Sequence, residues 1–247
     1  MSFPIPPNED LRLKALFRYE ILDTSAEQQY DDITAIASHI CEAPIALISL
    51  LDDQRQWFKS RIGISAEETE RDVAFCAHAI MQPDIFIIPD ALLDDRFSNN
   101  PLVTDSPNIR FYAGAPLTTA DGHNLGTLCV IDHQPRQLSS KQQEALAALS
   151  RQVISLMELR LTNKNQQQLL QEKINLIANL QEKVEYINKL EEFIPICSYC
   201  KKVHISRDAW QELDSYIHEH SSAKISHGIC PTCAKKFFPD YSEEETN

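Results

Sequence analysis

Residues 111–132 read Phe-Tyr-Ala-Gly-Ala-Pro-Leu-Thr-Thr-Ala-Asp-Gly-His-Asn-Leu-Gly-Thr-Leu-Cys-Val-Ile-Asp. Two apolar runs, 111–117 and 125–131, flank the pair Asp121-Gly122, which is a strong signal for the turn of a β-hairpin. The stretch therefore predicts two antiparallel strands that pair with each other.

The sequence before the hairpin predicts further helices and strands. Asn8 is an N-cap candidate for a helix over 8–18, and a second helix is expected over 25–41. The buried stripe of this second helix is predicted to comprise the apolar residues Ile33, Ile36, Ala37 and Ile40. The apolar run 45–51 predicts a buried strand, and the segment from Trp57 to Ile62 predicts a strand that pairs back on it.

Helical periodicity returns after the hairpin, from Ser139 onward. Helices before and after an antiparallel sheet define an α+β fold. We expect this domain to occupy residues 1–160.

Composition excludes several classes of partner. The 247 residues carry a formal net charge of −13, so nucleic acid and anionic membranes would repel the chain. With five glycines, the chain contains neither a dinucleotide-binding glycine pattern nor a P-loop. The N-terminus lacks the features of a signal peptide, and no apolar run is long enough to cross a bilayer. The sequence predicts a cytoplasmic protein without a nucleic-acid or membrane partner.

The segment 161–194 has the heptad spacing of a coiled coil. Two series of positions seven residues apart start at Leu156 and Leu159, and both are apolar between residues 177 and 187. No Pro or Gly occurs between Arg136 and Ile194, so one long helix is predicted. We expect a parallel homodimer through residues 156–194; the alternative is a single helix that packs back on its own domain.

Two Cys-x-x-Cys pairs lie in the last fifty residues. Cys197 and Cys200 form the first pair, and Cys230 and Cys233 the second. Two such pairs supply the four thiolates of a structural zinc site, with His227 as a possible substitute ligand. A redox dithiol is the competing interpretation. An amphipathic helix is predicted at 208–220, between the pairs.

We therefore predict a four-cysteine zinc-binding module over 195–240, followed by a disordered acidic tail at 241–247. A closed shell of four protein ligands leaves no open position for a substrate. The module is expected to bind a protein partner that the sequence does not name. The segment 196–238 resembles a short cysteine-rich segment at the ends of some bacterial sensory and response-regulator proteins.

Residues 8–160 resemble a GAF domain of bacterial sensor kinases and cyclic-dinucleotide signalling proteins. The resemblance rests on these phrases, in order: Arg18-Tyr-Glu-Ile-Leu-Asp-Thr, Trp57-Phe-Lys-Ser-Arg, Phe75-Cys-Ala-His-Ala-Ile, Pro89-Asp-Ala, Asp95-Arg-Phe-Ser-Asn-Asn-Pro-Leu-Val, Ile109-Arg-Phe-Tyr-Ala-Gly-Ala-Pro-Leu and Leu125-Gly-Thr-Leu-Cys-Val-Ile-Asp. It implies an antiparallel sheet with a ligand-sized pocket on one face, and helices that transmit a signal into a downstream coiled coil.

Six residues in these phrases are candidates for binding a small, unidentified ligand in that pocket: Cys76, His78, Asp90, Arg96, Arg110 and Tyr112. The alternative for the charged ones is an ion-paired loop scaffold. For His78 it is an ordinary buried histidine, and for the cysteines small buried apolar residues.

The sequence as a whole predicts a signal-transduction protein. A GAF-like domain would sense a ligand and signal through a dimeric coiled coil to the zinc-stabilised module. We identify no kinase, cyclase or phosphodiesterase motif, so an enzyme is not the favoured interpretation. The alternatives are a thiol redox enzyme resembling methionine sulfoxide reductases, working through Cys76 and Cys129, and a haem- or chromophore-based sensor.

Overall fold

The computed structural model describes residues 4–191 and 193–239, so the acidic tail predicted at 241–247 lies outside the described residues. The chain divides into two compact units, Met1–Leu170 and Gln171–Asn247. The boundaries of the four segments expected from the sequence stay predictions.

An antiparallel sheet of six strands forms the centre of the first unit, in the order β3-β2-β1-β6-β5-β4. The strands are β1 (Ile45–Leu51), β2 (Arg55–Ile62), β3 (Glu68–Glu70), β4 (Phe86–Ile88), β5 (Phe111–Thr118) and β6 (Asn124–Asp132). The hairpin predicted around Asp121-Gly122 is confirmed as β5–β6, with Gly122 at a φ of +83° in the connecting loop. The strand at the end of the hairpin, β6, also pairs with β1, so it lies in the interior of the sheet.

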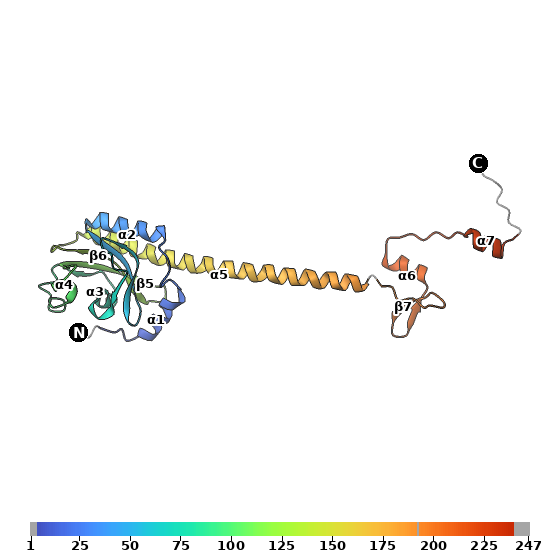
Figure 1. The fold of residues 1–247 in the computed structure, drawn as a ribbon, viewed down its shortest axis with the longest axis horizontal. Coiled ribbons are helices and arrows are strands. Elements are labelled where there is room, and N and C mark those ends of the chain that lie inside the picture. The colour runs from blue at the N-terminus through green and yellow to red at the C-terminus, as the bar shows by residue number, and fades with distance from the viewer. Residues whose placement is uncertain (1–3, 192, 240–247) are drawn as a thin grey trace, which may run out of the picture. The chain divides into compact units, whose positions relative to one another are not determined.

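Helices cover both faces of the sheet (Figure 1). On one face lie α1 (Glu9–Arg18), α2 (Gln28–Cys41) and the beginning of α5 (Ser140–Glu191). The other face carries a short 3-10 helix (Arg71–Val73), α3 (Phe75–Ala79) and α4 (Pro101–Thr104). Each face has its own apolar core, and the predicted α+β class is confirmed.

The predicted apolar stripe of α2 is wrong in part. Ile33 and Ala37 are buried, but Ile36 is 46% exposed and Ile40 is 37% exposed. The buried residues are Tyr30, Ile33, Thr34, Ala37 and Cys41, each of which has another three or four positions away, as on one face of a helix. Tyr30 lies on the face that packs on the sheet, and Ile36 and Ile40 lie beside that face. The helix also begins at Gln28 rather than Ser25.

The long helix α5 is continuous over 52 residues, as the absence of Pro and Gly predicts. Leu146, Val153 and Met157 on its first turns are buried in the core that α1 and α2 share. Further along, apolar side chains are half exposed among the described residues; they are Leu169, Leu170, Ile174, Leu176, Ile177, Leu180, Val184, Tyr186 and Ile187. The helix thus begins as part of a folded core and continues with an uncovered apolar surface.

The second unit contains β7 (Val203–Ser206), β8 (Ala209–Gln211), α6 (Leu213–His220) and α7 (Pro231–Phe237). The helix predicted at 208–220 is wrong at its start, because Ala209–Gln211 pairs with β7 instead. Trp210 stands opposite His204 in that ladder, and α6 begins only after Glu212. Within the described residues, no helix is long and apolar enough to cross a membrane.

Candidate functional site

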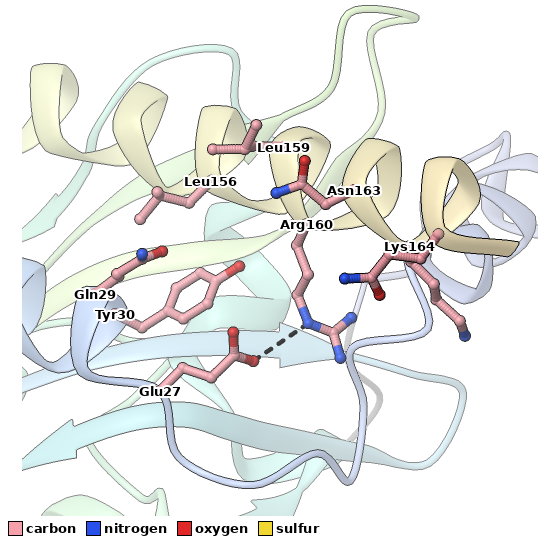
Figure 2. Close-up of a pocket in the computed structure, with 9 residues that line it drawn as sticks. Glu27, Gln29, Tyr30, Leu156, Leu159, Arg160, Asn163 and Lys164 are labelled. Carbon is pink, nitrogen blue, oxygen red and sulfur yellow. Dashed lines mark hydrogen bonds and ion pairs between the residues drawn. The ribbon is translucent and has the colours of Figure 1, made fainter. Parts of the chain in front are cut away.

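A cavity of about 390 Å³ lies between the start of α2 and the middle of α5 (Figure 2). It is lined by Glu27, Gln29, Tyr30, Leu156, Leu159, Arg160, Asn163, Lys164 and Gln167. All these residues belong to the first unit. Four of the polar or charged side chains come from α5, and a fifth comes from Glu27, the residue before α2. A molecule bound here would contact α5 directly.

Arg160 ties α5 to the sheet domain at this cavity. Its Nε lies 3.2 Å from Glu27 Oε1, and its Nη1 donates to the backbone oxygens of Tyr19 and Glu20 at 3.2 and 3.0 Å. Glu27 also accepts a hydrogen bond of 2.6 Å from Lys59 Nζ, and the Lys59 side chain on β2 is fully buried. One carboxylate therefore links a buried cation of the sheet to a cation of the long helix.

The Tyr30 hydroxyl is the unusual atom of the cavity. Its side chain is buried, and its oxygen has no hydrogen-bond partner within the part of the chain that the structure describes. Burial and the nearby Glu27 carboxylate raise the pKa of Tyr30 to about 12, so the hydroxyl keeps its proton. The cavity thus brings a buried hydroxyl together with an ion pair that joins α5 to the residue before α2.

Two of the predicted ligand-binding residues, Cys76 and Tyr112, lie together on the opposite face of the sheet. The Tyr112 hydroxyl donates a hydrogen bond of 3.2 Å to Cys76 Sγ, and the Thr127 hydroxyl donates one of 3.0 Å. Ser49 Oγ lies 3.2 Å from the same sulfur, and Cys129 Sγ lies 4.0 Å away. We call these five residues the thiol cluster. All of them are buried.

The cluster changes the acidity of its members. Burial acts to raise the pKa of Cys76, but the hydrogen bonds to its sulfur outweigh burial and lower that pKa below the ordinary value of a thiol. The pKa of Cys129 is raised, because its hydrogen bond with Cys76 and its burial both favour the protonated form. Burial and the two thiols also raise the pKa of Tyr112, so Tyr112 remains a hydrogen-bond donor.

Sequence reasoning missed Ser49 and Thr127 in this cluster, and Gly114 beside it. A Cβ atom on Gly114 would lie only 2.2 Å from the Tyr112 hydroxyl oxygen, so the glycine makes room for the ring to reach Cys76. A glycine within an apolar strand is the signal that could have indicated this close approach. Ser49 and Thr127 give no such signal, because short hydroxyl residues are common in strands.

The remaining predicted residues lie around this face without joining the cluster. His78 is half buried, with its ring 4.8 Å from that of Phe97, and burial lowers its pKa. Arg96 pairs with Asp94 at 2.6 Å and lies over the Phe97 ring. Asp90 accepts a hydrogen bond from the backbone of Leu92.

Arg110 contributes to the loop before β5. Its Nη1 donates to the backbone oxygens of Val103 and Ile109 at 2.9 and 3.0 Å. Like the contacts of Asp90 and Arg96, these hydrogen bonds hold loop backbone, and the ligand-binding role of the three residues stays a prediction. Within the described residues, none of the six predicted residues lines any of five cavities, one of which is the α2–α5 cavity.

The two cysteine pairs have the same local geometry. The backbone amide of Cys200 points at Cys197 Sγ, and that of Cys233 at Cys230 Sγ, both at 3.5 Å. These amides lower the pKa of Cys197 and of Cys230. No group of three or more His, Cys, Asp or Glu residues that could hold a metal forms within residues 4–191 and 193–239. His227 lies 3.0 Å from Asp214.

The family pattern described as GAF domain matches residues 25–155, which is more than half of the chain. The chain belongs to the GAF domain family. The matched residues of this GAF domain run from just before α2 into the buried turns of α5, and they include both the thiol cluster and Tyr30 of the cavity.

The chain is also similar to the cyclic di-GMP phosphodiesterase PA2567 of Pseudomonas aeruginosa. The two are 48% identical over 133 residues, which are 54% of this chain and 23% of the relative, so this chain spans less than a quarter of it.

Among solved structures, the GAF domain of an Acinetobacter phosphoenolpyruvate-protein phosphotransferase is 17% identical, with a TM-score of 0.46. The match covers 62% of this chain and 95% of that one. A type II free methionine-R-sulfoxide reductase of Thermoplasma acidophilum is 12% identical, with a TM-score of 0.45, and the match covers 53% and 90% of the two chains.

The tripeptide Glu144-Ala145-Leu146 has the letters of a Glu-Ala-Leu phosphodiesterase motif, but its place in the fold explains it otherwise. It lies in the second turn of α5, and Leu146 is fully buried in the core of the GAF domain. The leucine is a packing residue of the helix.

Proposed function

We propose that this protein is a signal-transduction protein whose GAF domain responds to a small molecule and passes the response along α5. In this proposal two chains pair through α5, and the zinc-stabilised C-terminal module binds a protein partner in the cytoplasm. The similarity to the Pseudomonas aeruginosa protein supports a sensory role for this chain. We propose no catalytic activity from it.

The observation that carries the proposal is the continuity of α5. The same helix supplies Leu146 and Val153 to the GAF core, lines the α2–α5 cavity with Arg160, and continues past the domain without a break. A ligand that changes the Glu27–Arg160 contact would change how the helix packs, and a rigid helix carries such a change over many turns.

A second copy of the same helix is the proposed occupant of the uncovered apolar surface. Leu170, Ile177 and Val184 recur at seven-residue spacing, with Leu180 and Ile187 in the companion series, and all five are half exposed. An isolated helix with this surface would leave it in water, whereas a coiled coil buries it. Apolar residues beside the seam, such as Ile174, widen the surface available for pairing.

Light scattering on the full chain tests the pairing. At micromolar concentration we expect twice the chain mass of 28.1 kDa. The double variant Ile177→Asp with Val184→Asp should return the mass to that of one chain, because it puts charges into the seam. The matched pair Asn175→Asp with Asn179→Asp lies on the other side of the helix and should stay dimeric. A single-chain mass for the unaltered protein would refute the pairing.

Zinc is the metal that we propose for the two cysteine pairs. Each pair presents a sulfur whose negative form is favoured by backbone amides, which is the arrangement that prepares a thiol to bind a soft divalent metal. A bound zinc ion would supply the cross-link that holds the two pairs together. The pairs would then form one structural site with Cys197, Cys200, Cys230 and Cys233 as ligands, and His227 as a possible substitute.

A further inference from the structure

The thiol cluster contains more polar groups than a buried cysteine needs. Three hydroxyls converge on Cys76 Sγ within 3.0–3.2 Å, from β1, β5 and β6. The surrounding core consists of apolar and aromatic side chains such as Phe75 and Phe97. A neutral thiol is only a weak acceptor, whereas a thiolate gains from every hydroxyl aimed at it. The arrangement is suited to the charged form of the sulfur.

A second thiol lies beside this one. Cys129 Sγ is 4.0 Å from Cys76 Sγ, so a rotation of the side chains can bring the two sulfurs to bonding distance. We propose that Cys76 and Cys129 form a redox site in the core of the GAF domain, at which a hydroperoxide oxidises Cys76 and Cys129 converts the product into a disulfide.

The chemistry balances in two steps. The Cys76 sulfur attacks one oxygen of hydrogen peroxide, the O–O bond breaks, and one water leaves, so that Cys76 becomes a sulfenic acid. The Cys129 thiol then attacks that sulfur, and the second water leaves as the S–S bond forms. The two thiols lose two electrons and two protons to the peroxide. A small dithiol reductant reverses the change by thiol–disulfide exchange.

Peroxide must first reach the buried sulfur of Cys76. Cys76 belongs to α3, a helix of five residues without a side-chain N-cap, which follows a 3-10 turn. Peroxide reaches the sulfur only when this short, buried helix opens locally, which parts of a fold can do without global unfolding. A disulfide would then tie α3 to β6, the strand that leads toward α5.

Cys41 provides a control within the same molecule. It is as buried as Cys76, at 1% exposure, but burial raises its pKa to about 11. No hydroxyl hydrogen bond to its sulfur occurs within the described residues. Solvent exposure is therefore matched between the two residues, and the set of hydroxyls around the sulfur differs.

Peptide mapping after peroxide treatment of the full chain tests the proposal. Trypsin places Cys76 on peptide 72–96, Cys129 on 111–136 and Cys41 on 19–55, each with a single cysteine. After treatment, quenching and alkylation under denaturing conditions, we expect peptides 72–96 and 111–136 joined by a disulfide, with Cys41 still alkylated. A dithiol should restore both free thiols. The proposal is wrong if Cys76 and Cys129 are oxidised no faster than Cys41.

Two variants separate the redox role from a packing role. Cys129→Ser removes the second thiol, so the sulfenic acid at Cys76 should persist and react with dimedone. Thr127→Val keeps the shape of the side chain but removes one hydrogen bond to the sulfur, and it should slow oxidation of Cys76 by about tenfold. Ser49→Ala serves the same purpose if Thr127→Val does not fold. An unchanged oxidation rate in a folded variant would contradict the proposed activation of the sulfur.

The redox site lies within the GAF domain and does not depend on the pairing of α5. A monomeric chain that still forms the disulfide would refute the dimer and leave the redox site intact.

Discussion

Glu9 is the residue on which the packing of α1 against the sheet domain depends most clearly. Its carboxylate binds Arg12 at 2.7 Å and Arg71 at 2.6 Å, and both guanidinium groups are almost completely buried. Burial acts to raise the pKa of Glu9, but the hydrogen bonds from the two arginines prevail and lower it from 4.5 to about 2. One carboxylate thus compensates two buried positive charges.

Replacing this carboxylate should destabilise the GAF domain strongly. We expect Glu9→Gln to lower the free energy of unfolding by about 3–5 kcal/mol, because two buried guanidinium groups lose the charge of this carboxylate. Urea denaturation followed by circular dichroism measures the change. Glu67→Gln is the matched control, since Glu67 pairs with Arg61 at the surface and its loss should cost less than about 1 kcal/mol. Equal effects of the two variants would contradict the role given to Glu9.

The same carboxylate predicts a dependence on pH. Because the pKa of Glu9 is lower in the folded state, the unfolded chain binds the proton more readily between pH 4.5 and about 2. The contribution of Glu9 to stability is therefore complete above pH 4.5 and is lost as the pH falls toward 2. In Glu9→Gln this part of the acid dependence should be absent.

At the scale of single helices and strands, local sequence patterns were sufficient to predict the central hairpin and the long helix. Asp121-Gly122 between two apolar runs and the absence of Pro and Gly after Arg136 are signals within one segment. The thiol cluster had no such signal. It joins Ser49, Cys76 and Thr127, which are 27 to 78 positions apart and meet only because β1 pairs with β6 and α3 packs across both.

The start of α6 shows how strand pairing overrides a helical pattern. Residues 208–220 have apolar positions at helical spacing, but Ala209–Gln211 pairs with β7. The His204 and Trp210 rings, 4.6 Å apart, pack against each other across that ladder. The pattern of residues 208–220 alone does not reveal that β7 is available as a partner strand, so the strand β8 could not be predicted from it.

Metal removal is the test of the cysteine pairs. We expect about one zinc per chain in the purified protein, and the four thiols of the pairs should be protected from alkylation. A chelator should then raise hydrogen exchange in residues 196–238, since binding and folding are coupled in so small a module. Cys200→Ser should reproduce the effect of the chelator, whereas Ser198→Ala, within the same pair, should not. Zinc-free protein with four freely titrating thiols would refute the site.

At the scale of the whole molecule, α5 belongs to both compact units of the chain. Its first turns contribute side chains to the core of the GAF domain, and its later turns carry the uncovered apolar seam. The proposed signalling function therefore depends on whether the seam pairs with a second chain in parallel and in register.

Site-specific photocrosslinking at the seam tests this most directly. A photoreactive benzoylphenylalanine at position 177 or 184 faces its own counterpart in a parallel dimer, whereas one at position 179 faces solvent. At micromolar protein we expect covalent dimers from 177 and 184, mapped to the same segment of the second chain, and few from 179. Single chains from all three positions, or equal yields, would contradict the parallel pairing.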